Sequence, residues 1–537
     1  MVRDLARLER DSFDVVVIGG GIYGLSTAWE LASGGLRVAI VERDDFGGGT
    51  SFNSLKTIHG GIRPLQHGAL REMREFVREQ RAIATIAPHL VRPLAFVVPT
   101  YRHPVRNRFA MGIFFRAFDR LAADRSAGVD PSRRLPPSRL VSRAECLEMN
   151  PAIDPAGVTG GAVWHDYQLH SPERYALALL HSAHRAGAAA ANYTEAVGLL
   201  ARDHRVGGIR LRDRLSGGEF EVAAPVVVNA AGPGAWPFLE RAGQLPSSRP
   251  APRFSLAMNL VVSHAPLSNA VGGVVEGRFL FMVPWRDRSI VGTSHDEAEP
   301  VGGGAPRPSA RQVEAFLREA MSAFPQARLT PAHVTLVHRG LLPAGRSPGS
   351  LLKHSIVHDH AADDLTGLLT VVGVRYTTAR ATATAAAGAV GRLLERPPAA
   401  SRTAMVPIEG GNITALQTFE RAETARSGLP RPLVGRLIAS YGTTWTAVET
   451  LIRDTPALGT PLSPACPITR AEVLHAAREE MAVHLPDALL RRTSAGAGGH
   501  PGADAVAAAA DVMAAECGWS PGRRSDEISA VADFYRS

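Results

Sequence analysis

Near the start of the chain, a short apolar run leads into a glycine-rich turn. Residues 13–18 read Phe-Asp-Val-Val-Val-Ile, and such a β-branched run is typical of a buried parallel strand. Residues 26–33 then follow a helical pattern, and residues 37–42 form a second apolar run that ends in an acid, Glu42. The turn before the helix contains three glycines in GxGxxG spacing: Gly19, Gly21 and Gly24. The pattern therefore predicts a strand, a tight turn, a helix and a second strand.

Proteins that bind dinucleotides use this order of elements. The first glycine permits the tight turn, the second lets the backbone approach a pyrophosphate, and the third lets helix and strand pack closely. The N-terminus of the helix stabilises the phosphate charge. Glu42 stands where a carboxylate accepts hydrogen bonds from ribose hydroxyls, with Arg43 beside it. We therefore predict that Gly19, Gly21, Gly24, Glu42 and Arg43 contact a dinucleotide.

Two later apolar runs, 224–232 and 368–373, predict further strands of the same sheet. The first ends in a turn of small residues, and the second precedes an alanine-rich helical pattern at 379–394. Small residues permit close approach to a cofactor, and hydroxyls and N–H groups at the start of a helix can hold its polar parts. The residues expected near the cofactor at these two turns are Ala231, Gly232, Gly373, Thr377 and Thr378.

The segments between and after these strands have other patterns. Strand-like runs at 256–262 and 279–285 predict a second sheet over the cofactor. After Pro397-Pro398, which is typical of a linker, helical patterns follow at 433–441, 445–453, 468–481 and 503–516. We therefore predict an α/β fold, in which a Rossmann-type domain is interleaved with a mixed-sheet α+β domain and is followed by an all-helical C-terminal domain.

Length and composition fit a large globular enzyme. The chain has 537 residues, 45% of them hydrophobic and 20% charged, which excludes a disordered protein, a collagen and a disulfide-stapled miniprotein. Its three cysteines show no metal-binding or disulfide spacing. The net charge of +8 indicates an anionic substrate, cofactor or lipid surface, although solvated arginines explain it equally well. Nothing resembles a nucleic-acid-binding module.

The sequence also bears on location. The first residues alternate in charge where a signal peptide needs an apolar core, and no apolar stretch approaches the ~20 residues that span a bilayer. We expect a cytoplasmic protein, with peripheral contact at the inner face of the membrane and a homodimer left open. Residues 106–121 predict a basic amphipathic helix that either lies on a membrane or packs on the core. Its predicted apolar face comprises Met111, Phe114, Phe115, Phe118 and Leu121.

Several motifs together resemble the FAD-dependent glycerol-3-phosphate dehydrogenases, within the D-amino-acid-oxidase-like flavoprotein superfamily. They are residues 46–63, 87–94, 164–168, 229–233, 284–285, 290–294, 469–472, 479–482 and 491–493. The resemblance extends over essentially the whole chain. It implies a discontinuous FAD-binding domain at 10–84, 171–239 and 346–396, a substrate domain at 85–170 and 240–345, and a helical domain at 397–537.

The resemblance also implies roles for single residues. Glycines 19, 21 and 24 would hold the FAD pyrophosphate, Glu42 the adenosine ribose, and Thr50 and Ser51 the phosphate and flavin side. The flavin ring would be lined by Gly373, Thr377 and Thr378. In the family, a small anionic substrate alcohol gives hydride to flavin N5 and its hydroxyl proton to a base or to solvent. The reduced flavin then passes electrons to quinone or oxygen.

The sequence departs from the family pattern where the substrate is expected. Asn259 replaces a histidine of the family pattern, and Leu342 replaces an arginine. Arg375 replaces a lysine, and Pro64, directly after Arg63, replaces a tyrosine. Losing the arginine removes a charge-assisted interaction of roughly 1.5–3 kcal/mol. One hypothesis is a changed substrate. The other is that Arg339 or Arg346 supplies the missing charge and the activity is ordinary.

Four residues are the candidates for catalysis: His59, Arg63, Arg375 and Asn259. His59 suits a general base, or it orders its loop. Arg63 and Arg375 can bind an anion. An amine or amino-acid oxidase of the same superfamily, and a flavin-binding partner without catalysis, stay as alternatives. We expect no metal, because the histidines at 333, 338, 354, 358 and 360 lack i, i+4 pairing with carboxylates.

Overall fold

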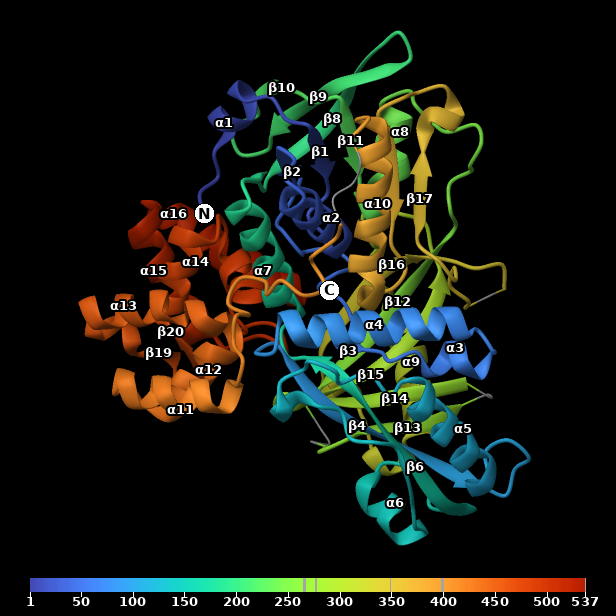
Figure 1. The fold of residues 1–537 in the computed structure, drawn as a ribbon. Coiled ribbons are helices and arrows are strands. Elements are labelled where there is room, and N and C mark those ends of the chain that lie inside the picture. Colours follow the sequence, from blue (N-terminus) through green and yellow to red (C-terminus); the bar gives the residue numbers. More distant parts are fainter. Residues whose placement is uncertain (264–266, 276–277, 348, 397–399, 537) are drawn as a thin grey trace.

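The structure is a computed structural model that describes residues 1–263, 267–275, 278–347, 349–396 and 400–536. The predicted linker at Pro397-Pro398 lies outside these residues. Within the described residues the chain forms two large sheets with covering helices and a separate group of C-terminal helices (Figure 1). The predicted α/β fold class is therefore confirmed.

The first large sheet has six strands in the order β17-β18-β11-β1-β2-β7, and only β17 runs antiparallel to its neighbour. Its strands come from distant parts of the chain: β1 (Val15–Ile18), β2 (Val38–Val41), β7 (Ala189–Ala191), β11 (Val226–Asn229), β17 (Ile356–Asp359) and β18 (Leu368–Val372). The runs predicted at 13–18, 37–42, 224–232 and 368–373 supply four of them. A crossover topology of this kind is that of a Rossmann-type sheet.

Both faces of this sheet are covered. Val15, Val17 and Ile40 pack on a helical layer of α2 (Ile22–Ser33), α7 (Pro172–Arg185) and α10 (Ala379–Leu393). Val16 and Val41 point the other way and pack on α1 (Leu5–Arg10), α8 (Ala235–Arg241) and a three-stranded sheet. That small sheet consists of β8 (Thr194–Arg202), β9 (Arg205–Asp213) and β10 (Glu219–Ala223). Burial on both faces explains why the predicted strands are apolar throughout.

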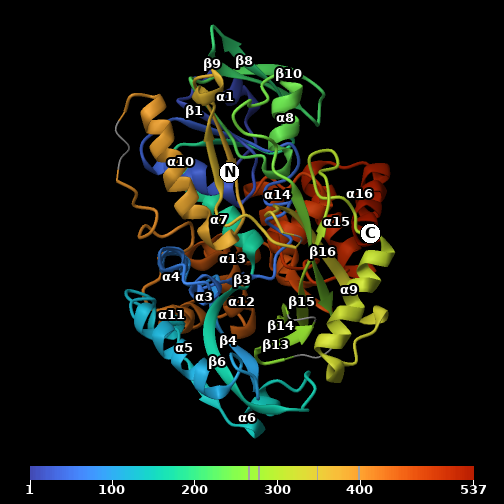
Figure 2. The ribbon, with the colours of Figure 1, turned by 90° about the vertical axis from the view of Figure 1, so that its right-hand side faces the viewer.

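The second large sheet has nine strands. They are β3 (Thr57–Ile58), β4 (Val91–Tyr101), β5 (Arg139–Val141), β6 (Val158–Leu169), β12 (Phe254–Val262), β13 (Ala270–Val275), β14 (Arg278–Trp285), β15 (Arg288–Glu297) and β16 (Val334–Pro343). α9 (Ala310–Ala323) packs on one face, as Figure 2 shows. Four more helices lie in the same half of the molecule as this sheet, in the lower part of Figure 1. They are α3 (Ile62–Gln66), α4 (Leu70–Ile86), α5 (Arg108–Leu121) and α6 (Arg143–Met149). β3 belongs to this sheet, whereas the resemblance places residues 10–84 in the FAD-binding domain; the domain boundaries stay a prediction.

The helix predicted from 106–121 forms as α5, but it has two apolar faces. Phe115 and Phe118 are buried, and Met111 and Phe114 pack beside the rings of the nine-stranded sheet. The apolar face predicted from the sequence therefore faces the core, except for the partly exposed Leu121. No helix in the described residues is long and apolar enough to cross a membrane.

The C-terminal helices form a group beside α7 (Figure 1). They are α11 (Leu416–Ser427), α12 (Arg431–Tyr441), α13 (Thr446–Asp454), α14 (Arg470–Glu479), α15 (Ala503–Cys517) and α16 (Pro521–Tyr535). The four predicted helices correspond to α12 to α15, whereas the prediction missed α11 and α16. The domain is not purely helical, since β19 (Pro461–Ser463) pairs with β20 (Cys466–Thr469).

A buried ion pair joins this helical group to the loop after β2. The Asp45 carboxylate accepts hydrogen bonds of 2.6 Å from both terminal nitrogens of Arg492 and also pairs with Arg491. The side chains of Asp45 and Arg492 are 2% and 0% exposed. Removing one partner of such a pair leaves a buried charge without compensation.

Replacing Asp45 with asparagine is therefore expected to lower the free energy of unfolding by about 3–5 kcal/mol. The exposed pair Arg210–Glu221 provides a control, because Glu221→Gln should change stability by less than about 1 kcal/mol. Burial opposes ionisation, but Arg492 and Arg491 hold the pKa of Asp45 well below its ordinary value. This stabilisation is present above the unfolded pKa of about 3.9 and is lost as the pH falls below it, so the two denaturation curves should converge in acid. Equal stability of Asp45→Asn and wild type at neutral pH would contradict this account.

Candidate active site

The turn after β1 has no room for side chains at two glycines. Gly19 has φ +102°, and a Cβ atom there would lie 2.6 Å from the carbonyl oxygen of Ala230. A Cβ atom at Gly24 would lie 1.9 Å from the carbonyl oxygen of Gly19. At Gly21 the nearest atom is Ser51 Oγ, 3.3 Å from the added Cβ. The turn, the start of α2 and the end of β11 thus pack as closely as the GxGxxG spacing requires.

Glu42 and Ser51 both meet this turn. Glu42 accepts hydrogen bonds from the N–H groups of Gly20 (2.6 Å) and Asp44 (2.9 Å), and burial raises the pKa of its carboxyl group. Each carboxylate oxygen retains a lone pair for a ribose hydroxyl. Ser51 Oγ accepts a hydrogen bond of 2.9 Å from the N–H of Ile22, at the first turn of α2. These groups fit the ribose and pyrophosphate of a dinucleotide.

Arg43, which is predicted to contact the dinucleotide, has partners within the protein. Its guanidinium donates to the carbonyl of Gly302, and its Nε lies 3.2 Å from Asp44 Oδ2. Arg43 therefore holds a loop of the 240–345 segment against the loop after β2. Ala231 and Gly232 follow β11 as predicted, and Gly232 takes φ +58° with no atom within 4 Å of an added Cβ.

The flavin end predicted from the sequence gathers residues of three distant segments. Thr50 Oγ1 accepts a hydrogen bond of 3.2 Å from Leu341 N–H, and a Cβ at Gly340 would lie 2.7 Å from the Thr50 methyl group. Thr377 Oγ1 accepts a hydrogen bond of 3.3 Å from the N–H of His59. Thr378 precedes α10 and lines a cavity there. His59 and Thr377 thus meet although more than three hundred positions separate them, and Thr50 meets β16.

Tyr23 is a residue of this site that the sequence analysis missed. A Cβ at Gly373 would lie 1.8 Å from the Tyr23 ring, so only glycine fits there. The Tyr23 hydroxyl donates to the carbonyl of Arg375 at 2.7 Å and accepts from the N–H groups of Val374 and Arg375. It therefore ties the dinucleotide turn to the end of β18. Its position inside the GxGxxG motif was the signal that could have identified it.

His59 is held by a buried carboxylate. Its Nδ1 lies 3.5 Å from Asp166 Oδ2, and its side chain is 52% exposed. Asp166 Oδ1 accepts hydrogen bonds from the N–H of Gly60 (2.8 Å) and from Gln80 Nε2 (2.9 Å). Asp166 therefore positions the loop that carries His59. The sequence analysis noted the motif at 164–168 but did not select this residue.

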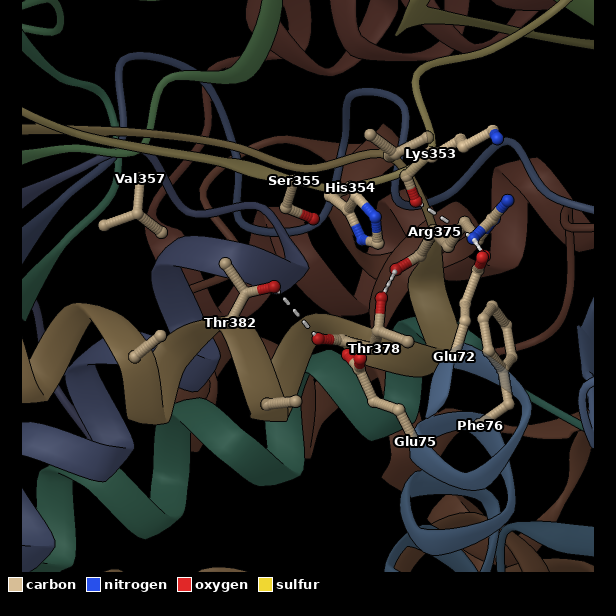
Figure 3. A pocket seen from close by; sticks show the side chains of 13 residues that line it. Glu72, Glu75, Phe76, Lys353, His354, Ser355, Val357, Arg375, Thr378 and Thr382 are labelled. Atoms are coloured by element: carbon tan, nitrogen blue, oxygen red, sulfur yellow. Dashed lines mark hydrogen bonds and ion pairs between the residues drawn. The ribbon is translucent and has the colours of Figure 1, made fainter. Parts of the chain in front are cut away.

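The two candidate arginines differ in their partners. Arg375 pairs with Glu72, donates to the Lys353 carbonyl at 3.1 Å and lies over the Phe76 ring, as Figure 3 shows. Its charge is thus compensated. Arg63, on α3, is exposed, and within the described part of the chain its guanidinium has no hydrogen-bond or ion-pair partner. Arg63 is therefore free to bind an anion.

The cavity in Figure 3 has a volume of about 180 Å³ and lies between α4, α10 and the segment before β17. Lys353, His354, Arg375 and Thr378 line one part of it, and Glu72 and Glu75 line another. Thr378 Oγ1 donates to the Arg375 carbonyl at 3.4 Å. The cavity thus combines cationic and anionic groups next to residues predicted to line the flavin.

The position of Leu342 follows from strand alternation. In the register of β12 with β16, Asn259 is opposite His338, Ala257 is opposite Gly340, and Ser255 is opposite Leu342. Cross-strand partners, and residues two positions apart on one strand, lie on the same face of the sheet. On this face Gly340 contacts Thr50. Leu342 is therefore on the face that meets Thr50, which is the side predicted to face the flavin. Arg339 points to the opposite face, so it is not placed to replace the missing arginine.

Two further side chains share the face of Leu342. Asn259 Oδ1 accepts a hydrogen bond of 2.7 Å from Thr293 Oγ1, which fixes the orientation of its amide. His295, which the sequence analysis did not select, lies 3.2 Å through Nδ1 from Ser255 Oγ. Burial, and then the positive charges of Arg63 and Arg278, lower the pKa of His295 to about 4. His295 is thus a neutral hydrogen-bonding group at neutral pH.

Comparisons with known proteins agree with this geometry. A family model described as FAD dependent oxidoreductase matches residues 14–350, which is more than half of the chain. The chain belongs to this family. A second model, the C-terminal domain of alpha-glycerophosphate oxidase, matches residues 401–524.

Similar proteins extend the match to both ends of the chain. A glycerol-3-phosphate dehydrogenase of Synechocystis sp. is 28% identical over 99% of this chain and 98% of its own. Glycerol-3-phosphate dehydrogenase 2 of Mycobacterium bovis is 31% identical over 97% of this chain and 88% of its own. The structure of the glycerol-3-phosphate dehydrogenase of Bacillus halodurans, complexed with FAD, has a TM-score of 0.78 at 22% identity and covers 99% of this chain and 96% of its own.

This FAD-dependent oxidoreductase thus has the cofactor that the sequence predicted. The close-packed glycine turn, Glu42 and Ser51 fit the dinucleotide part of FAD. The roles of Thr50, Gly373 and Thr377 at the flavin end stay predictions. The resemblance to glycerol-3-phosphate dehydrogenases is confirmed, and the alternatives of an amine oxidase and of a partner without catalysis are not favoured.

Proposed function

We propose that this enzyme oxidises a small anionic hydroxy compound and that its preference has moved away from glycerol 3-phosphate. FAD, when bound, accepts the hydride and later passes the electrons on. The relatives named as glycerol-3-phosphate dehydrogenases support a CH–OH donor. The observation that carries the change in preference is Leu342 on the flavin-side face of β16, where it contributes no charge.

Arg63 binds the anionic group of the substrate in this proposal. It is the candidate arginine without a partner in the described residues, whereas Arg375 is compensated by Glu72. A guanidinium binds a carboxylate or phosphate through two parallel hydrogen bonds, which also orients the substrate. A site with a single free guanidinium suits a small substrate with one anionic group.

His59 takes the proton of the substrate hydroxyl. Its imidazole is half exposed and can accept a proton from a bound substrate. The nearby Asp166 carboxylate stabilises the imidazolium that forms, because its Oδ2 lies 3.5 Å from His59 Nδ1. His295 is a poorer base, since its pKa of about 4 keeps it neutral and weakly basic.

The changed preference is tested by Leu342→Arg in the FAD-loaded protein. Because an arginine here adds a charge-assisted contact of roughly 1.5–3 kcal/mol, glycerol 3-phosphate at limiting concentration should reduce the flavin about 10–150 times faster than in the wild type. Stopped-flow bleaching of the flavin measures the rate. Leu342→Met is the control of similar size. Rapid bleaching of wild-type flavin by millimolar glycerol 3-phosphate, with no gain in Leu342→Arg, would show that the preference is unchanged.

For the electron acceptor, we propose a membrane quinone reached by peripheral contact through α5. Val105, Phe109 and Ile113 are 68%, 78% and 54% exposed. Phe109, Ile113, Arg116 and Arg120 are spaced i, i+4, i+7 and i+11, so they share one face of the helix. An apolar patch followed by cations suits an anionic lipid surface.

We expect the protein to float with vesicles that contain anionic lipid and to float much less after Phe109→Ser with Ile113→Ser. The control is Leu215→Ser with Leu245→Ser, which removes two exposed leucines elsewhere and should leave flotation unchanged. Flotation that is absent in the wild type, or equal in all three proteins, would exclude α5 as the contact.

A further inference from the structure

Three metal-ligating side chains meet at the outer edge of the six-stranded sheet, in a place with no assigned role. His358 is on β17, and His360 and Asp363 are in the single turn that follows it. His358 Nε2 lies 2.6 Å and His360 Nδ1 lies 3.6 Å from Asp363 Oδ2. One ligand atom of each residue lies within 4.8 Å of the others. The expectation of no metal considered only helical i, i+4 spacing, whereas here a strand end and a turn bring the ligands together.

The separations suit a tetrahedral divalent ion. Zn²⁺ binds nitrogen and carboxylate oxygen at about 2.0–2.2 Å, so ligand atoms around it are roughly 3.4 Å apart. His360 Nδ1 and Asp363 Oδ2, 3.6 Å apart, already have nearly this separation. His358 Nε2 and Asp363 Oδ2 are hydrogen-bonded at 2.6 Å and would move apart by roughly 0.8 Å around an ion. The two histidines are 8% and 1% exposed, so the cluster is not an accidental pairing of surface groups. Two imidazoles and one carboxylate leave a fourth position for water.

The outer partners orient the ligand atoms. His360 Nε2 hydrogen-bonds to Thr370 Oγ1 at 2.8 Å, which leaves Nδ1 directed to the cluster. Asp363 Oδ1 accepts from the N–H of Ser248 at 2.7 Å and from Ser247 Oγ at 3.3 Å, which leaves Oδ2 as the ligand atom. In metal sites, a second hydrogen bond of this kind fixes the tautomer and the orientation of each ligand.

We propose that His358, His360 and Asp363 form a Zn²⁺ site outside the active site. The ion would join the end of β17 to residues 247–248, which lead into β12. Through the hydrogen bond between His360 and Thr370, it would also constrain β18, the strand that ends next to Gly373. The metal thus stabilises the corner where the chain passes from the six-stranded to the nine-stranded sheet. The inference does not depend on the identity of the substrate.

The test is titration of Zn²⁺ into the untagged, metal-stripped, FAD-loaded protein by calorimetry, with Co²⁺ absorption as a second readout. We expect one ion per chain with micromolar or tighter affinity, and a tetrahedral Co²⁺ spectrum. His358→Gln and Asp363→Asn should each weaken binding by at least about 100-fold, and Thr370→Val by about 10–100-fold. Bound Zn²⁺ should raise the Tm of the wild type but not of Asp363→Asn.

His204→Gln is the matched control, because His204 forms an exposed two-residue pair with Asp364 at 3.0 Å. It should bind Zn²⁺ as the wild type does. Flavin content shows whether each variant folds. The proposal is overturned if the wild type shows no saturable binding at one ion per chain. It is also overturned if folded Asp363→Asn and His358→Gln bind as the wild type does, or if His204→Gln loses binding.

Discussion

Replacing Gly24 with alanine is expected to abolish FAD binding. The added Cβ would lie 1.9 Å from the carbonyl oxygen of Gly19, which is backbone in the tightest part of the turn. Neither atom can move without separating α2 from β1, and the phosphate-binding end of the helix would move with it. We expect Gly24→Ala to be expressed at the normal level and the purified protein to show no flavin absorbance.

A milder variant keeps this prediction testable if Gly24→Ala does not fold. At Gly21 an added Cβ meets only Ser51 Oγ, at 3.3 Å, so Gly21→Ala should fold but should place a methyl group in the path of the pyrophosphate. We expect its affinity for FAD to fall by more than about 100-fold, a loss of roughly 3 kcal/mol. Gly49→Ala, with no atom within 4 Å of its added Cβ, is the control and should keep its flavin. Normal flavin content in Gly24→Ala would contradict the assignment of the dinucleotide turn.

Replacing Arg63 with alanine is expected to raise KM for the anionic substrate by about 10–150-fold, which corresponds to the roughly 1.5–3 kcal/mol of a charge-assisted interaction. Arg63→Lys should recover only part of the affinity, since an ammonium lacks the two-pronged geometry of the guanidinium. FAD content should not change in either variant, because Arg63 is on α3 and not at the dinucleotide turn. Steady-state kinetics with ionic strength held constant provide the measurement.

The variant Arg375→Lys distinguishes the role of Arg375 from that of Arg63. Because Arg375 already pairs with Glu72 and stacks on Phe76, its replacement should affect stability more than KM. If Arg375→Lys raised KM as strongly as Arg63→Ala while Arg63→Ala had no effect, the assignment of the anion contact would be reversed.

The sequence is most predictive for elements that depend on residues within one short segment. The turn from β1 to α2 could be predicted because its glycines, its apolar strand and its helix lie within one short segment. The strands β11 and β18 could be predicted as strands, since burial on both faces requires apolar residues at every position. Their membership of the sheet that contains β1 was also predicted, but their order in it was not, because no local pattern determines which distant strands become neighbours.

The candidate site was less predictable, since its side chains depend on contacts between distant segments. Arg375 has the same charge as Arg63, but only the structure shows that Glu72 compensates it. The choice between Leu342 and Arg339 required the strand register, which a single sequence does not determine. On α5, a helical pattern identified one apolar face correctly, but the exposed pair Phe109 and Ile113 was not singled out.

We propose that an anionic hydroxy compound delivers hydride to FAD in a site where Arg63 binds its charge. The direct measurement is anaerobic reduction of the FAD-loaded protein by a panel of matched compounds: glycerol 3-phosphate, glycerate, lactate, glycerol and alanine. We predict that at least one anionic hydroxy compound bleaches the flavin, that glycerol does not, and that Arg63→Ala slows the productive reaction. Bleaching by alanine alone, or by no compound although dithionite reduces the flavin fully, would contradict the account.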